Sequence, residues 1–133
     1  MPDQGIVETN NLIDYSIIIP AFNEQNYIGE VLDTLLAGMN KTSDLKGEII
    51  VVDNNSTDQT AQLAESKGVR VVFEAINQIS RARNTGSKVA KGEYLIFVDA
   101  DTLISQELLD LSLQKLKQGK CGGGGATIVF DTN

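Results

Sequence analysis

The 133-residue sequence contains no histidine, no tryptophan and a single cysteine. Without histidine, the chain cannot form a Ser-His-Asp or Cys-His nucleophilic site, an HExxH zinc site or an imidazole general base. The lone cysteine, Cys121, excludes an internal disulfide and a CxxC redox or zinc motif, and it fits a reducing cytosol. These absences exclude catalytic triads and HExxH-type metalloprotease chemistry from this chain.

Basic residues are also scarce, because 11 Lys and Arg stand against 18 Asp and Glu and give a net charge of −7. An acidic chain repels the phosphates of nucleic acids, so we expect no nucleic-acid partner. The residues 1–14 include three carboxylates and no Lys or Arg, which is the reverse of the basic start of a signal peptide.

Long apolar runs are missing as well. None approaches the roughly 18 to 20 residues that a membrane-spanning helix needs, so we expect no membrane span in this chain. The length favours a single domain with a real core, which we place at 15–133 after an N-terminal extension over 1–14. We expect a cytoplasmic protein that reaches the inner membrane surface only through parts outside this chain.

Short runs rich in isoleucine and valine alternate with segments of helical periodicity. The sequence predicts strands over 15–20, 48–52, 69–73, 93–98 and 126–130. It predicts four helices, which end near Met39, Lys67, Lys91 and Gln118, the third of them covering 80–91. Asn23 is expected to cap the first helix and Ser105 the fourth. Ser56 and Gln59 have the spacing of a capping box for the second helix.

Strands that are apolar on both faces and separated by helices are typical of βαβ units. We therefore expect an α/β fold with a mostly parallel sheet and helices on both faces. Right-handed crossovers bring the carboxyl ends of all strands to one rim, where such folds bind ligands. The segments that reach this rim are 20–24, 53–56 and 99–101.

Four glycines at 122–125 precede the last predicted strand. Because they do not open a helix, they are not a dinucleotide-binding fingerprint, and we interpret them as a flexible loop or a closely packed edge. An incomplete sheet edge near residues 126–131 would favour self-association, which makes a homo-oligomer one hypothesis.

Asp99-Ala100-Asp101 follows directly after the apolar run 95–98. In extended backbone, residues i and i+2 point the same way, so both carboxylates would face one side about 7 Å apart. Their repulsion is costly unless a cation or a set of donors neutralises it. Hard oxygen ligands of this kind suit Mg²⁺ or Mn²⁺, which also bind phosphate oxygens. The alternative is that one Asp caps a turn or helix and the other is solvated.

Other polar residues of the rim have two interpretations each. Asp53 ends the second predicted strand, where its carboxylate can accept a base N–H or simply stabilise a turn. Arg81 and Arg83 can pair with a nucleotide or with the acidic side chains of the rim. Residues 20–24 form a ligand-facing loop or only end the strand and cap the helix, and Phe22 belongs to the core or faces a base.

Four segments occur in a fixed order along the chain. They are SIIIPAFNE at 16–24, IVVDNNSTDQT at 50–60, ARNTG at 82–86 and GEYLIFVDAD at 92–101. Together they resemble the family 2 glycosyltransferases of the GT-A fold, over residues 15 to about 131. The resemblance implies a UDP- or GDP-sugar donor, an acceptor of unknown class and a divalent cation, Mn²⁺ or Mg²⁺. It also implies inversion at the anomeric carbon by direct attack of an acceptor hydroxyl.

By position, the resemblance assigns residues of this chain to parts of the donor. Asp53 would read the base with Arg83 beside it, Asp99 would lie near the ribose and diphosphate, and Asp101 would hold the metal on the diphosphate. Asp101 and Asp99 are thus the implied metal ligands. The implied nucleotide-sugar-binding residues are Pro20, Ala21, Phe22, Asn23, Glu24, Asp53, Asn55, Arg83, Asp99, Ala100 and Asp101.

The chain departs from the family pattern in two respects. Ile79 and Ser80 stand where many members have a glycine before the 82–86 segment. Family modules also usually continue beyond the length of this chain, and their second half supplies the acceptor site and the general base. We therefore expect the base beyond Asn133, and we expect this chain to be the donor-binding half, without transferase activity on its own.

Two other interpretations compete with this one. The segment 97–102 resembles the first motif of haloacid-dehalogenase-like phosphatases, but too few residues follow Thr102 to supply that family's later Lys and carboxylates. A non-catalytic nucleotide-sugar-binding module would share every donor-site residue with the transferase.

Overall fold

The structure, a computed structural model, describes residues 12–41, 44–119 and 127–130. Within these residues, five parallel strands form one sheet in the order β3-β2-β1-β4-β5. The strands are β1 (Tyr15–Ala21), β2 (Gly47–Asp53), β3 (Arg70–Phe73), β4 (Tyr94–Val98) and β5 (Thr127–Phe130). The helices are α2 (Ile28–Lys41), α3 (Thr60–Ser66), α4 (Ile79–Val89) and α5 (Gln106–Gly119). The predicted α/β class is confirmed.

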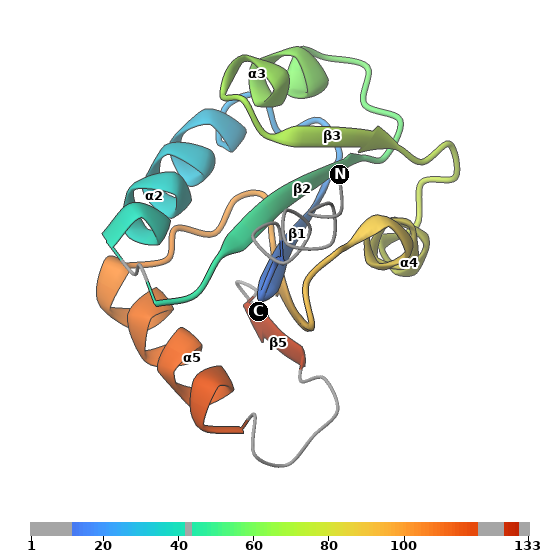
Figure 1. Cartoon of the computed structure of the whole chain (residues 1–133). Coiled ribbons are helices and arrows are strands. Elements are labelled where there is room, and N and C mark those ends of the chain that lie inside the picture. The colour runs from blue at the N-terminus through green and yellow to red at the C-terminus, as the bar shows by residue number, and fades with distance from the viewer. Residues whose placement is uncertain (1–11, 42–43, 120–126, 131–133) are drawn as a thin grey trace, which may run out of the picture.

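The sheet has an apolar core on each face, because side chains alternate between the two faces of a strand. Ile17 and Ile19 of β1 pack into the cluster that contains α2, α3 and α5, whereas Ile18 packs with Ala82 of α4. In Figure 1, α2, α3 and α5 accordingly lie on one side of the sheet and α4 on the other. Burial on both faces explains the continuous apolar run of β1.

Helix α4 lies close to β1 and β2 because Gly86 has no side chain. A Cβ atom at Gly86 would lie 2.5 Å from Cγ2 of Ile18 and 3.1 Å from Cγ2 of Val52. Glycine lowers helix propensity, but here it permits the close approach of helix and sheet. The helix predicted over 80–91 is confirmed, and it runs from Ile79 to Val89.

Two predicted helix caps are wrong. Helix α3 begins at Thr60 with Gln59 at its N-cap position, and no side-chain hydrogen bond caps it, so Ser56 does not form a capping box. Helix α2 begins at Ile28, several residues after Asn23. Both polar side chains instead join two neighbouring loops.

Other predicted helix ends are confirmed. The Oγ of Ser105 accepts a hydrogen bond from the N–H of Leu108 at 3.1 Å, as expected for the N-cap of α5. Gly68 follows the end of α3 with a φ of 83°, a left-handed conformation that glycine adopts without a steric penalty.

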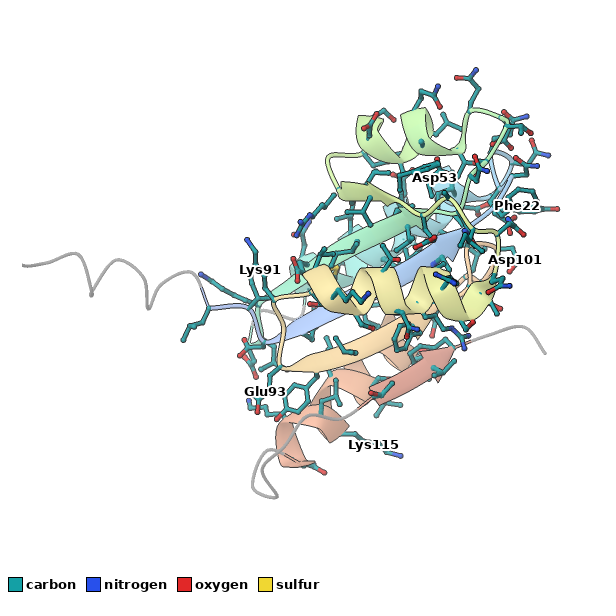
Figure 2. All side chains as sticks on the ribbon, turned by 90° about the vertical axis from the view of Figure 1, so that its right-hand side faces the viewer. Phe22, Asp53, Lys91, Glu93, Asp101 and Lys115 are labelled. Carbon is teal, nitrogen blue, oxygen red and sulfur yellow. The ribbon has the colours of Figure 1, made fainter. Side chains whose placement is uncertain are left out.

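The two ends of the sheet carry different polar groups. Figure 2 shows Phe22, Asp53 and Asp101 at one end of the molecule and Lys91 and Glu93 at the opposite end. The first of these is the carboxyl end of the strands, where the sequence predicts a ligand site.

At the amino end of the strands, the polar groups bond to one another. Ser16, which is fully buried, donates its hydroxyl to Oε2 of Glu48 at 2.6 Å. The same oxygen accepts the N–H of Lys91 at 2.7 Å, and the Ser16 Oγ accepts the N–H of Gly92 at 2.9 Å. This network ties β1, β2 and the turn before β4 together.

Several predictions lie outside the described residues. They concern most of the N-terminal extension, Cys121, the glycine run 122–125 and the first residue of the predicted strand 126–130. Among the described helices, none is long and apolar enough to cross a membrane.

Candidate functional site

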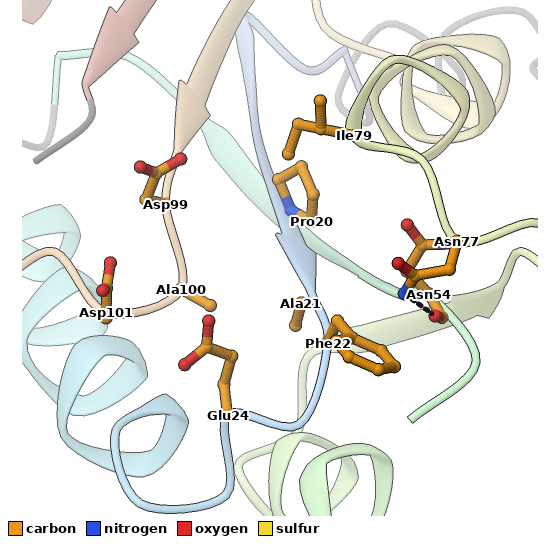
Figure 3. Close-up of a pocket in the computed structure, with 10 residues that line it drawn as sticks. All are labelled: Pro20, Ala21, Phe22, Glu24, Asn54, Asn77, Ile79, Asp99, Ala100 and Asp101. Atoms are coloured by element: carbon orange, nitrogen blue, oxygen red, sulfur yellow. Dashed lines mark hydrogen bonds between the residues drawn. The ribbon is translucent and has the colours of Figure 1, made fainter. Parts of the chain in front are cut away.

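An open cleft of about 340 Å³ lies at the carboxyl end of β1 and β4. Figure 3 shows the carboxylates of Glu24, Asp99 and Asp101 on one side of it and the amides of Asn54 and Asn77 on the other. The residues that line it are Pro20, Ala21, Phe22, Glu24, Asn54, Asn77, Ile79, Asp99, Ala100 and Asp101. Most of the predicted rim residues therefore share one cavity.

The acidic side of the cleft holds carboxylates close to one another. Partial burial, followed by the charges of Asp101, Asp99 and Asp58, raises the pKa of the Glu24 carboxyl above its ordinary value of 4.5. The ion pairs Lys67–Asp33 and Lys117–Asp44 lie outside the cleft. A cation in the cleft would offset this concentration of negative charge.

The Asp99-Ala100-Asp101 segment is a turn and not extended backbone. Strand β4 ends at Val98, and the N–H of Thr102 donates to the carbonyl oxygen of Asp99 at 3.0 Å. The predicted i, i+2 strand geometry is therefore wrong. Both carboxylates nevertheless line the cleft, because the turn wraps around the buried Ala100.

The amide side of the cleft is built around Asn54, which is 4% exposed. Its Nδ2 donates to the carbonyl oxygens of Glu74 at 3.0 Å and Ile76 at 2.6 Å. Asn77 in turn donates its Nδ2 to the carbonyl oxygen of Asn54 at 3.0 Å, the contact marked in Figure 3. Neither amide, nor Ile79 beside them, was among the predicted site residues.

Glu74 stabilises the same side of the cleft. Its carboxylate accepts hydrogen bonds from the hydroxyl of Thr85 and from the N–H of Ile76. These two bonds, together with the charges of Arg81 and Lys88, hold the pKa of Glu74 below its ordinary value of 4.5. The segment between β3 and α4 is thus fixed by hydrogen bonds although it has no regular secondary structure.

Asn23 does not line the cleft. It has a φ of 52°, in the left-handed region, and its Oδ1 accepts the N–H of Thr57 at 2.8 Å. Its own N–H donates to Oγ of Ser56 at 2.9 Å. Asn23 therefore joins the loop after β1 to the loop after β2.

A second set of bonds strengthens this connection. The N–H of Glu24 donates to Oγ1 of Thr60 at 2.8 Å, and the N–H of Gln25 donates to Oδ2 of Asp58 at 3.3 Å. Although burial acts to raise it, hydrogen bonds from Thr60 and Gln25 hold the pKa of Asp58 below its ordinary value of 3.8. Two loops more than 30 positions apart in sequence are thereby held as one unit.

Asp53 and Asn55 also lie outside the lining of the cleft. Asp53 is 8% exposed, and its Oδ1 accepts the N–H of Ser56 at 3.0 Å, which is the turn interpretation of this residue. Asn55 has a φ of 67° and donates its Nδ2 to the carbonyl oxygen of Ala75 at 3.3 Å. Both residues shape the loop that carries Asn54.

Arg83 lies on α4 with its guanidinium over the ring of Phe97, 5.6 Å from the ring centroid. Its buried Nε has no hydrogen-bond partner in the part of the chain that the structure describes. Arg81 is exposed on the same helix. Neither arginine lines the cleft.

The fold and the cleft define a class of protein. An open parallel sheet, covered by helices on both faces and with its cavity at the carboxyl ends of the strands, is the Rossmann-like arrangement that binds ligands at that rim. The sequence profile described as "Glycosyl transferase family 2" matches residues 16–131. The chain belongs to this family, which rules out the dehalogenase-like interpretation of 97–102.

Individual relatives agree with this assignment. The chain is 34% identical over 110 residues to the uncharacterized glycosyltransferase EpsJ of Bacillus subtilis (strain 168), covering 79% of this chain and 31% of EpsJ. It is similar to the crystal structure of Staphylococcus aureus TarS 1-349 in complex with UDP-GlcNAc, with 33% identity and a TM-score of 0.67 over 80% of this chain and 32% of that one.

A third relative is a mannosyltransferase. The mannosyltransferase PcManGT from Pyrobaculum calidifontis, in complex with GDP-Man and Mn²⁺, is 28% identical with a TM-score of 0.69 over 79% of this chain and 32% of that chain. Both similar structures support the predicted GT-A fold. The chain spans about a third or less of the length of the curated relatives it matches.

Proposed function

We propose that the chain is the donor-binding part of an enzyme that transfers a sugar from a nucleoside-diphosphate sugar to an acceptor hydroxyl. The observation that carries the proposal is the cleft of a family 2 domain, in which Glu24, Asp99 and Asp101 face the amides of Asn54 and Asn77. A UDP-sugar and a GDP-sugar, the kinds of ligand bound in the two similar solved structures, are the candidate donors.

We propose for individual residues the roles that the family resemblance implies. Residues 20–24 line the base and ribose, and Asp53 accepts an N–H of the base through the carboxylate oxygen that does not bond Ser56. Arg83 lies beside the base. Asp99 binds near the ribose and diphosphate, and Asp101 holds the cation. The bound donor would thus extend from the amide side of the cleft to its acidic side.

The donor set fits a divalent cation such as Mn²⁺ or Mg²⁺. Carboxylate oxygens are hard ligands, and no three ligand side chains of the described residues form a closed site by themselves. Such a cation keeps water and phosphate oxygens as further ligands, which suits this partial set. When bound, it supplies Lewis-acid stabilisation of the charge that develops on the departing diphosphate.

We further propose that transfer inverts the anomeric carbon through direct attack of the acceptor hydroxyl. In that reaction the acceptor oxygen bonds to the anomeric carbon as the bond from that carbon to the diphosphate oxygen breaks, and the hydroxyl proton passes to a general base. The residues of this chain bind the donor, and the interlocked loops around Asn23 keep residues 20–24 in place while the leaving group departs.

A melting-temperature panel tests the proposal. The wild-type chain and Asp101→Ala are heated with UDP, GDP or ADP, each with and without Mn²⁺. Ligand at a hundredfold excess over Kd stabilises the native state by about 2.7 kcal/mol. We expect a metal-dependent rise in Tm with UDP or GDP that Asp101→Ala abolishes.

Asp110→Ala on α5, which removes a carboxylate away from the cleft, should keep the full response. A wild-type chain whose Tm responds to none of the three nucleotides, with or without Mn²⁺, would contradict the proposal.

A further inference from the structure

We infer that Asn54 is a positioning residue, which acts on the donor by holding the amide side of the cleft in place. The effect of Asn54 on donor binding rests on the proposed function. Its effect on the conformation of the cleft can be tested without any nucleotide. Asn54 ends no strand and begins no helix, and its local sequence gives no sign of such a role.

Asn54 contacts two elements that are far apart in sequence. Its backbone N–H donates to the carbonyl oxygen of Ala21 at 2.8 Å, on the floor of the cleft. Its side-chain Nδ2 donates to the carbonyl oxygens of Glu74 and Ile76, in the segment between β3 and α4. One residue therefore connects the end of β1, the loop after β2 and the segment that precedes α4.

The segment after β3 depends on these contacts for its conformation. Residues 74–78 contain no helix or strand. The carbonyl oxygen of Ile76 accepts both the Nδ2 of Asn54 and the N–H of Gln78. Asn77 and Ile79, which line the cleft, follow directly in the chain. Moving the Ile76 carbonyl would therefore move the residues that face the ligand.

Only an amide at position 54 fits this geometry. Both partners of the side chain are carbonyl oxygens, so the side chain must supply two N–H donors. An ionised aspartate has the same shape but no donor, and it would set a negative charge against two carbonyls. A leucine has a similar size but supplies no donor, so the Glu74 carbonyl loses the Asn54 bond and the Ile76 carbonyl keeps only that of the Gln78 N–H.

The first test measures amide hydrogen exchange without nucleotide in Asn54→Leu and Asn54→Asp. The same two changes at Asn40, an exposed asparagine of α2, are the controls. We expect exchange in residues 76–78 to accelerate about tenfold in the Asn54 variants, as loss of one net hydrogen bond implies. The Asn40 variants and the amides of β1 should keep wild-type rates. Wild-type exchange at 76–78 in a folded Asn54 variant would overturn the inference.

The second test separates positioning from general support of the fold. The Kd for UDP or GDP with Mn²⁺ is measured in Asn54→Leu, in Asn77→Ala and in the double variant. If Asn54 acts by positioning Asn77, Asn54→Leu weakens binding about tenfold alone but much less when Asn77 is already removed. Full additivity of the two changes would overturn the inference.

The two proposals fail differently. A wild-type chain that binds no nucleotide contradicts the proposed function, and the exchange rates at 76–78 then decide on Asn54 alone. If Asn54→Leu does not fold, the isosteric Asn54→Asp provides both readouts.

Discussion

The two ends of the parallel sheet treat carboxylates in opposite ways. At the amino end, the Glu48 carboxylate has hydrogen-bond donors, since its Oε2 accepts both the Ser16 hydroxyl and the Lys91 N–H. At the carboxyl end, the Glu24 carboxylate accepts no hydrogen bond from the described residues, and its partial burial and the nearby charges of Asp101 and Asp99 raise its pKa. A carboxylate whose hydrogen bonds are made within the protein stabilises the fold. Carboxylates that lie close together without such bonds are suited to bind a ligand or a cation.

The difference extends to the backbone. At the amino end the chain segments are packed so tightly that Gly92 touches the backbone of β1. At the carboxyl end two asparagines adopt left-handed conformations, Asn23 and Asn55, in loops that surround an open cleft. Changes at the amino end should therefore cost stability, and changes at the carboxyl end should cost binding.

The largest expected effect is that of Gly92→Ala at the amino end. The new Cβ would lie 2.5 Å from the carbonyl carbon of Tyr15 and 2.6 Å from the N atom of Ser16, and these backbone atoms cannot move away cheaply. We expect a loss of about 3 kcal/mol in the free energy of unfolding. Urea denaturation followed by circular dichroism measures it.

Gly29→Ala is the matched control, because a Cβ there meets only Cε of Lys67 at 3.8 Å, inside α2. Its free energy of unfolding should equal or exceed that of the wild type. If both alanine variants had the same free energy of unfolding, the tight packing at Gly92 would not contribute to the stability of the fold.

A smaller loss is expected for Ser16→Ala. The change removes the donor to Glu48 and leaves the partly buried N–H of Gly92 without its acceptor. We expect about 2 kcal/mol of destabilisation, measured as above. Ser66→Ala, which removes an exposed hydroxyl bonded to the Leu63 carbonyl, should change stability by less than about 0.5 kcal/mol. If Ser16→Ala and Ser66→Ala lost similar amounts of stability, the hydrogen bonds at the amino end of the sheet would have no special weight.

The smallest effect is the pH dependence that Glu24 causes at the carboxyl end. Burial and the neighbouring carboxylates raise its pKa in the folded state above 4.5, so the folded protein binds this proton more tightly than the unfolded chain. The stabilisation is present at low pH and is lost as the pH rises through the raised pKa.

Glu24→Gln should therefore gain stability over the wild type as the pH rises above 4.5, by less than about 1 kcal/mol. Urea denaturation at several pH values in the absence of divalent cations measures the difference. If the stability difference between Glu24→Gln and the wild type did not change with pH, ionisation of Glu24 would not destabilise the folded protein.

The strands were the most predictable part of the fold. Strands buried on both faces need apolar runs, and the predicted 15–20, 48–52 and 93–98 differ from β1, β2 and β4 by no more than one residue at either end. The position of the site was predictable for the same reason, because parallel strands bring their carboxyl ends together. Seven predicted residues line the cleft: Pro20, Ala21, Phe22, Glu24, Asp99, Ala100 and Asp101.

The caps and the amide side of the cleft were not predictable from local sequence. Asn23 and Ser56 have the chemistry of helix caps, but they bond to each other's loops across more than 30 positions. Asn54 stands in a polar run where any residue could serve a turn, and its partners Glu74 and Ile76 follow only after α3 and β3. Long-range hydrogen bonds override local preference at these positions.

The strand order has a consequence for synthesis of the chain. β1 lies in the middle of the sheet, and its neighbours are β2 and β4, with Tyr15 paired to both Gly47 and Tyr94. One side of β1 therefore stays unpaired on the ribosome until β4 has emerged, and such distant pairing slows folding. During that interval the nascent chain exposes one edge of an isoleucine-rich strand, the kind of surface that makes folding intermediates prone to aggregate.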